Sequence, residues 1–378
     1  MFLLKCTRIS LLVLILWNIP AFLLHYFTPS MASLSSYLTS ALFLGYFVLA
    51  PKSIKPAYPF ILLGLLYFSI ASFNYSYLDV DNFFIKEFLR LMIVVTFGAA
   101  LVGQTNIKEL YVVILLGAIS IFINALIFPQ MSVNIGRAAG FYLNANTAGA
   151  LCIIGYGLSY GIKEKSLRII GQIVFTFAGI LTFSRTFIII WLFLNLIAIY
   201  RSKKNMLAPI IGIIALILIF TFADELTLDK QRFTAFQSFL ERGDNRSAQT
   251  LQEGSRDETW AQYYDLIMEN PWTGHGFMSF QKLENNKPGA HNTYLMIIGE
   301  SGILPFLLHL GIYTMLFIGS LRKFKTQPEY VNITIGLILF MLTSHTYFVN
   351  FYLILISMYV YVNLKKNDGV VEIENIKS

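Results

Sequence analysis

Long apolar blocks alternate with short polar connections along the whole chain, and each block has roughly the length of helix that spans a bilayer. The blocks lie near residues 9–27, 31–50, 57–73, 83–102, 110–128, 144–162, 168–183, 186–200, 207–223, 292–320, 329–345 and 347–363. Because the hydrocarbon core takes about 20 residues of helix to cross, this pattern predicts an all-α polytopic membrane protein with about twelve transmembrane helices.

Basic residues occur in every second connection between these blocks. They are Lys5, Arg8, Lys52, Lys55, Lys108, Lys163, Lys165, Arg168, Arg201, Lys203, Lys204, Arg322, Lys323, Lys325, Lys365 and Lys366. Cytoplasmic connections carry an excess of Lys and Arg, so this spacing predicts that both termini are cytoplasmic. The opposite short connections carry almost no positive charge, and their two arginines, Arg137 and Arg185, therefore stand out.

The apolar stretch 169–200 has Arg185 at its middle, and it fits either one long tilted helix or a hairpin of two short spans. One helix would place three later basic clusters outside, whereas a hairpin keeps every cluster inside. Helices of about 15 residues rise only about 22 Å, less than the core thickness of about 30 Å. Arg185 at the tip should then lie below the outer surface, where a charge is costly and indicates function.

One long polar segment, residues 224–291, lies on the predicted outer side. It separates spans one to nine (1–223) from spans ten to twelve (292–363), which a cytoplasmic tail (364–378) follows. A helix is predicted at about 256–269, from Ser255 and Glu258 at capping-box spacing, an apolar stripe of Trp260, Tyr264 and Ile267, and the stop signal Asn270-Pro271. The segment is too short for a domain of its own, so we expect it to pack on the spans as a lid.

Composition supports the membrane class and narrows the chemistry. The 378 residues are 56% hydrophobic and 13% charged, with a mean hydropathy of +0.64, which excludes a soluble domain. The net charge of +7 comes from residues between apolar blocks, so we do not expect nucleic-acid binding. No P-loop or His-Glu-x-x-His motif occurs, and we expect no cofactor and no metal. The first block could be a signal peptide, but its length favours an uncleaved anchor.

Unusual polar residues collect at one predicted depth, the outer third of the membrane and the loop above it. They are Lys86, Glu87, Arg90, Arg137, Arg185, Arg256, His291 and His345. Several arginines around an outward cavity suit a diphosphate, which Arg binds through paired N–H donors, and a histidine can act as a general base near neutral pH.

Ordinary explanations compete with a site role for several of these residues. Lys86 and Arg90 share one helix face and could form an interfacial patch. Arg137 could anchor its loop. Arg256 stands at the start of the loop helix, where the helix dipole disfavours a cation, and this favours an anionic partner.

The stretch "PGAHNTYLMIIGESG" combines His291 and Asn292 at the mouth of a block with Glu300 inside it. Nine residues of helix place His291 and Glu300 on opposite faces and about 13 Å apart along the axis. His291 is therefore the candidate base. We expect Glu300 to pair with a polar group of a neighbouring span, or to be protonated, and to support this helix. Asn292 and His345 are further supporting candidates.

Four segments in order, "GRAAGFYLNANTAG", "TFSRT", "GSRDETWAQYYDLIMENPWTGHGF" and "HNTYLMIIGESG", resemble the O-antigen ligase and O-antigen polymerase superfamily of bacterial inner-membrane proteins over roughly residues 130–320. The resemblance implies a metal-independent, inverting glycosyltransferase that uses an undecaprenyl-diphosphate-linked glycan at the periplasmic face. It assigns Arg185 and Arg256, and less directly Arg137, to the diphosphate, and His291 to activation of the acceptor hydroxyl. Family members often have Asn-Pro-Asn where this chain has Asn144-Ala145-Asn146, which puts the shape of that turn in doubt.

The acceptor would be another glycan for a polymerase or lipid A-core for a ligase, and other polysaccharide-assembly proteins are conceivable partners. The modest outer loop, with nothing that marks a lipid A-core site, favours the polymerase. A small-anion secondary transporter is the alternative from another class. Transporters place polar groups at mid-membrane in repeated halves, whereas here they collect at one end. A structural scaffold would not need buried arginines.

Overall fold

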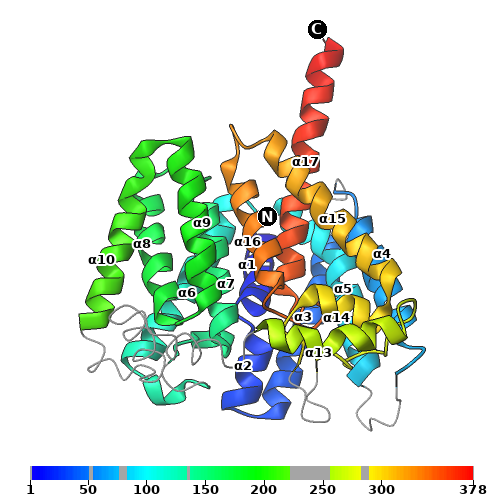
Figure 1. Ribbon diagram of the computed structural model, residues 1–378. Helices are drawn as coiled ribbons and strands as arrows, with labels where there is room; N and C mark the ends of the chain where they lie inside the picture. The colour runs from blue at the N-terminus through cyan, green and yellow to red at the C-terminus, as the bar shows by residue number, and fades with distance from the viewer. Residues whose placement is uncertain are drawn as a thin grey trace. The chain divides into compact units, whose positions relative to one another are not determined.

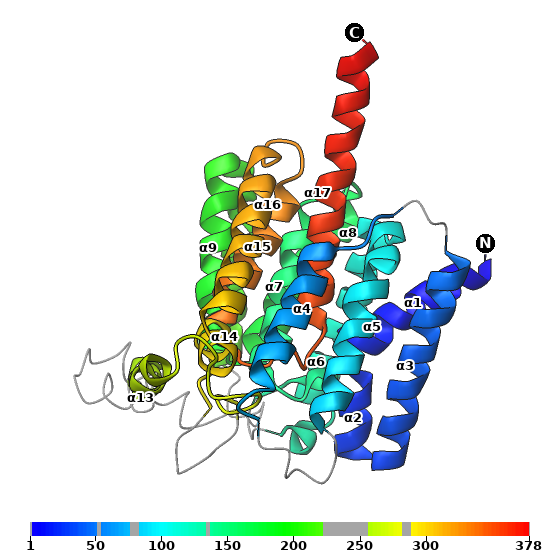
Figure 2. The same cartoon turned by 90° about the vertical axis from the view of Figure 1, so that its right-hand side faces the viewer.

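The computed structural model describes residues 2–50, 54–75, 83–133, 137–221, 256–281 and 289–377 (Figures 1 and 2). These residues form α-helices and short 3-10 helices, and no strand occurs among them. The chain divides into two compact units, the first made of Met1–Val113 and Tyr263–Ser378 and the second of Ile114–Gln262. The predicted all-helical class is confirmed for the described residues.

The first unit begins with a bent pair of helices rather than the single helix expected at residues 9–27. Helix α1 (Phe2–Leu16) and helix α2 (Ile19–Tyr26) are bent by 56° at a short break. Asn18 lies in the break with φ 53, a left-handed conformation that Asn tolerates better than most residues. Pro20, which follows in the first turn of α2, has no N–H to continue the ladder of α1.

The rest of the first unit is a bundle that includes helix α4 (Tyr58–Ala71). Its other helices are α3 (Pro29–Leu49), α5 (Phe83–Gln104), α14 (Thr293–Ser301), α15 (Ile303–Arg322), α16 (Pro328–Met341) and α17 (Tyr352–Lys377). Helix α4 packs against α5, α14 and α15, and α17 packs against α5, α15 and α16. Figure 2 shows α15 and α16 side by side. Helices α6 (Ile107–Leu126) and α13 (Arg256–Glu269) cross the boundaries between the units.

The apolar block 292–320, predicted as one helix, is two helices that meet at Gly302. This residue has φ 79 and ψ −173, a combination that is essentially restricted to glycine. A Cβ at this position would lie 2.0 Å from the carbonyl oxygen of Trp272. Helix α14 is therefore a separate short element, and Glu300 lies at its carboxyl end instead of deep inside a long span.

Among the described residues, the second unit contains four α-helices of its own, of which α7 (Ala145–Ser159) is almost wholly buried and packs against α8 and α9. The others are α8 (Lys165–Leu181), α9 (Arg185–Arg201) and α10 (Leu207–Thr221), with 3-10 helices η1 (Pro129–Met131), η2 (Gly140–Tyr142) and η3 (Lys203–Met206). Figure 1 shows α8, α9 and α10 running alongside one another. Gly155 of α7 faces Phe175 of α8 so closely that a Cβ would lie 2.3 Å from that ring, so a small residue is needed for the two helices to pack at this distance.

Two of the expectations about spans can be compared with the helices. Residues 169–200 form the hairpin α8–α9, with the turn at 182–184, so the alternative of one long helix is wrong. Among the described residues, α3, α6 and α15 are long and apolar enough to cross a bilayer, and α1 with α2 adds a fourth if the bent pair is one span. The helices are those of a membrane protein, while the count of about twelve and the orientation stay predictions. Several helices of the structure, such as α7 with 15 residues, are shorter than the roughly 20 residues that a crossing takes.

Candidate functional site

His291 and His345 lie against each other in the first unit. His291 precedes α14 and is exposed, with its backbone in the left-handed region at φ 46. Its N–H donates to Nδ1 of His345 at 3.0 Å, and the two ring centroids are 4.4 Å apart. Two candidates from distant parts of the sequence are thereby brought together at the start of α14.

His345 lies in the connection 342–351 between α16 and α17, because α16 ends at Met341 rather than at residue 345 as the apolar block indicated. Burial, and then the neighbouring His291, lower the pKa of His345 to about 4. The imidazole is therefore neutral near pH 7, in agreement with an Nδ1 that accepts a hydrogen bond. His345 can hold the backbone of His291 in place without adding a charge beside it.

The amino end of α14 is fixed by the two residues that follow His291. The side-chain oxygen of Asn292 accepts from the N–H groups of Tyr294 at 2.9 Å and Leu295 at 3.3 Å, so Asn292 is the N-cap. The hydroxyl of Thr293 donates to the carbonyl of Ser344 at 2.7 Å. The helix start and the His345 connection are thus bonded to each other at His291 itself and at Thr293.

Glu300, at the other end of α14, is fully buried and well supplied with hydrogen-bond donors. Its carboxylate accepts from the hydroxyl of Tyr67 on α4, from the N–H of Phe280 at 3.0 Å, and from the amide of Gln281 at 2.9 and 3.2 Å. The expectation that Glu300 pairs with a polar group of a neighbouring helix is confirmed by Tyr67. A buried acidic group costs least when donors surround it in this way.

The turn after α13 closes the carboxyl end of α14. The N–H groups of His275 and Gly276 donate to the carbonyls of Gly299 at 2.7 Å and Glu300 at 3.1 Å. These are among the last carbonyls of α14, which have no partner within the helix. The segment "TGHGF" (273–277) is therefore a cap that joins the loop to this helix.

Helix α13 begins at Arg256 and ends at Glu269, as the sequence predicted. Ser255 and the side chains of Arg256 and Glu258 lie outside the described residues. The apolar stripe differs from the expected one, because Tyr263 is 2% exposed whereas Tyr264 is 51% exposed. Tyr263 packs on Phe280, with ring centroids 4.6 Å apart. The buried tyrosine is therefore the one that contacts Phe280, whose N–H donates to Glu300.

In the second unit, Arg137 is bound to the hairpin that carries Arg185. Its Nε donates to the carbonyl of Thr182 at 3.1 Å and its Nη2 donates to Oδ1 of Asn146 at 3.0 Å. The same Asn146 oxygen accepts from the hydroxyl of Ser184 at 3.0 Å. Arg137 thus makes the contacts expected of a residue that anchors its loop. The same contacts place it beside the turn between α8 and α9.

Arg185 is exposed and is the first residue of α9, whose N-cap is Ser184. The positive end of the helix dipole disfavours a cation in this turn, so the position favours an anion beside it. Asn144 caps α7 by accepting from the N–H groups of Asn146 and Thr147, so the turn keeps a capped start although it lacks proline. Arg137 and Arg185 belong to the second unit, whereas His291 and His345 belong to the first.

Lys86, Glu87 and Arg90 belong to the first turns of α5. Arg90 forms an ion pair with Glu87, whose side chain is 3% exposed, at 2.5 Å. Both residues line a cavity of about 340 Å³. Lys86 is exposed, in keeping with an interfacial residue. Arg90 therefore has a structural partner in Glu87. The sequence alone did not distinguish an interfacial patch from a site role for Arg90.

Metal ligands do not gather in the described part of the chain. No group of three or more His, Cys, Asp or Glu side chains there could hold an ion. The acidic pair Asp79 and Asp81 lies outside the described residues.

Comparison with known families supplies the remaining observation. Residues 170–310 match the family model of the O-antigen ligases. The resemblance to the O-antigen ligase and polymerase superfamily is thereby confirmed. The matched segment contains Arg185, Arg256, His291 and Glu300, whereas Arg137 lies before it. No significant match to a curated protein was found.

Proposed function

We propose that the protein is a polymerase of the O-antigen type, a glycosyltransferase that joins repeat units supplied as undecaprenyl-diphosphate-linked glycan. The observation that carries this proposal is His291, an exposed histidine held by His345 and by the capped start of α14, inside the segment that matches the O-antigen ligases. A site fixed from both sides can hold a base within reach of a substrate hydroxyl.

In the proposed reaction, His291 takes the proton of the acceptor hydroxyl. The hydroxyl oxygen forms a bond to the anomeric carbon of the donor while the bond from that carbon to the diphosphate oxygen breaks. Attack from the side opposite the leaving group inverts the configuration. The departing diphosphate carries the negative charge, and Arg185 and Arg256, with Arg137 behind the hairpin, stabilise it. No residue in this scheme needs a metal ion.

The proposal includes a location. The chain would lie in the bacterial inner membrane with about twelve spans, both termini cytoplasmic, and His291 and Arg185 at the periplasmic face. The distribution of Lys and Arg between successive connections supports this orientation. The acceptor is the nonreducing end of another lipid-linked glycan. Because the matching family is described as O-antigen ligase, transfer to lipid A-core is the second candidate.

Substitutions in a deletion strain would test both the site and the activity. We expect His291→Ala and Arg185→Ala each to abolish glycan transfer while the protein still inserts in the membrane. His25→Ala and Arg322→Ala, at an exposed histidine of α2 and in the last turn of α15, are matched controls. On a lipopolysaccharide gel, loss of a polymerase leaves core with one repeat, and loss of a ligase leaves bare core with accumulated lipid-linked polymer. Full activity of both site variants would refute the assignment.

A further inference from the structure

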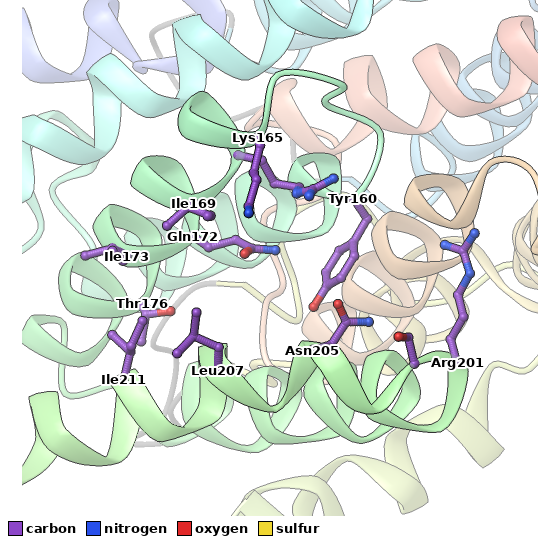
Figure 3. A pocket seen from close by; sticks show the side chains of 12 residues that line it. Tyr160, Lys165, Ile169, Gln172, Ile173, Thr176, Arg201, Asn205, Leu207 and Ile211 are labelled. Carbon is purple, nitrogen blue, oxygen red and sulfur yellow. The ribbon is translucent and has the colours of Figure 1, made fainter.

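A cavity of about 620 Å³ opens in the second unit at the end of α8 and α9 that is remote from Arg185 (Figure 3). Helix α8 starts at this end with Lys165, and α9, which begins at Arg185, reaches it after 17 residues with Arg201. A helix of that length rises about 25 Å, so the cavity is separate from the hairpin that carries the diphosphate candidates.

Three cations converge on this cavity, namely Lys165, Arg168 and Arg201. No acidic side chain is among the described residues that line it. Lys165 and Arg168 lie in the first turn of α8, where the helix dipole opposes a positive charge. The three side chains and the amino end of α8 would attract an anion into the cavity.

Part of the cavity wall is apolar, beside the polar Gln172 and Thr176. Ile169 and Ile173 of α8 and Ile211 of α10 lie together on the side away from Arg201 (Figure 3). Next to them, Ile210 and Ile214 of α10 are 47% and 50% exposed, so the apolar wall continues onto an outer face of the unit. A site with cations on one side and an apolar wall that continues to the outside suits a molecule with a charged head and a hydrocarbon chain.

We propose that this cavity binds the phosphate head group of an anionic phospholipid, with an acyl chain along the isoleucines. Its volume is in the range of about 300–1,000 Å³ that is typical of ligand sites. Basic pockets between transmembrane helices are suited to anionic lipid head groups. The rule for cytoplasmic Lys and Arg explains why basic residues occur in these connections. It does not require three of them to converge on one cavity with an apolar wall.

Native mass spectrometry of the full chain in detergent would test the site. We expect phosphatidylglycerol to be retained about tenfold more strongly than phosphatidylcholine, as about one charge-assisted hydrogen bond would provide. Arg168→Gln and Arg201→Gln, on two different helices, should each remove most of this preference. Arg322→Gln, a basic residue in the last turn of α15 that does not line the cavity, should retain it.

Two outcomes would overturn the proposal. Equal retention of the two lipids by the wild-type chain, or an unchanged preference in both cavity variants, would show that the cations do not select the head group. Inorganic phosphate is the second arm, because it shares the anion but has no acyl chain. If millimolar phosphate displaces the phospholipid completely, the cavity is a site for a free anion and not for a lipid. Thermal unfolding of each variant without lipid checks that it is folded.

Discussion

Replacing Gly302 by alanine should destabilise the junction between α14 and α15 by about 3 kcal/mol or more. Its φ of 79 and ψ of −173 lie in a region that costs a non-glycine residue about 1–3 kcal/mol. The new Cβ would also lie 2.0 Å from the oxygen and 2.3 Å from the carbon of the Trp272 carbonyl. These are backbone atoms, so the clash cannot be relieved by a rotamer change. The neighbouring bond from the N–H of Ile303 to the Pro271 carbonyl, 2.9 Å long, should be lost as well, at about 1 kcal/mol.

Gly311→Ala is the matched control in the same pair of helices. Gly311 lies inside α15, and nothing would come within 4 Å of its new Cβ. Alanine is favoured over glycine in a helix by up to about 1 kcal/mol, so this variant should be as stable as the wild type or slightly more stable. Equilibrium unfolding of the full chain in mixed micelles measures both changes. Equal stability of the two variants would refute the account of the Gly302 junction.

Three further predictions concern the two ends of α14 and the hairpin. Arg137→Ala should lower stability by about 2 kcal/mol through two lost hydrogen bonds. Arg137→Lys should recover little of this in an unfolding assay, since one ammonium cannot replace both donors, and full recovery would show that charge alone matters. Glu300→Gln should keep most of the stability and the transfer activity, whereas Glu300→Ala should lose several kcal/mol by leaving buried donors unpaired. An inactive but stably folded Gln variant would instead assign the carboxylate to the reaction. The folded pKa of His345, about 4, is below its unfolded value of 6.5, so the unfolded chain binds more protons between these values. Stability should therefore fall by up to about 3 kcal/mol as the pH drops from about 6.5 to about 4. His345→Gln should remove this dependence in thermal unfolding curves, and an unchanged curve would contradict it.

Most helices could be predicted because their signals, apolar blocks and polar connections, are local. The hairpin at residues 169–200 was predicted from the basic clusters in later connections, which one long helix would have placed outside. The loop helix at 256–269 was predicted correctly because its stop signal is adjacent in the sequence. The break at Gly302 also had a local signal, the glycine pair of "GESG", but the apolar residues on both sides of this segment favoured one helix.

The contacts that build the candidate site depend on packing between distant segments. His291 and His345 are 54 residues apart, and Tyr67 and Glu300 are 233 residues apart, so neither pair has a spacing that a sequence pattern can show. The sequence predicted only that Glu300 needs a polar partner and that His345 lies near the depth of His291. The choice of Tyr263 over Tyr264 is similar, because both follow Trp260 at helical spacing.

Helix α14 connects the candidate base His291 at one end to the buried Glu300 at the other. At its amino end, Asn292 caps the helix and His345 holds the backbone of His291. At its carboxyl end, Glu300 is bonded to α4 and to the segment after α13, and Gly302 lets the chain turn away. About two and a half turns separate the two ends, so a rigid shift of the helix at Glu300 would also displace His291. A displacement of about 1 Å can lower a catalytic rate about a hundredfold. Burial of Glu300 among its hydrogen-bond donors is therefore consistent with a role in positioning His291.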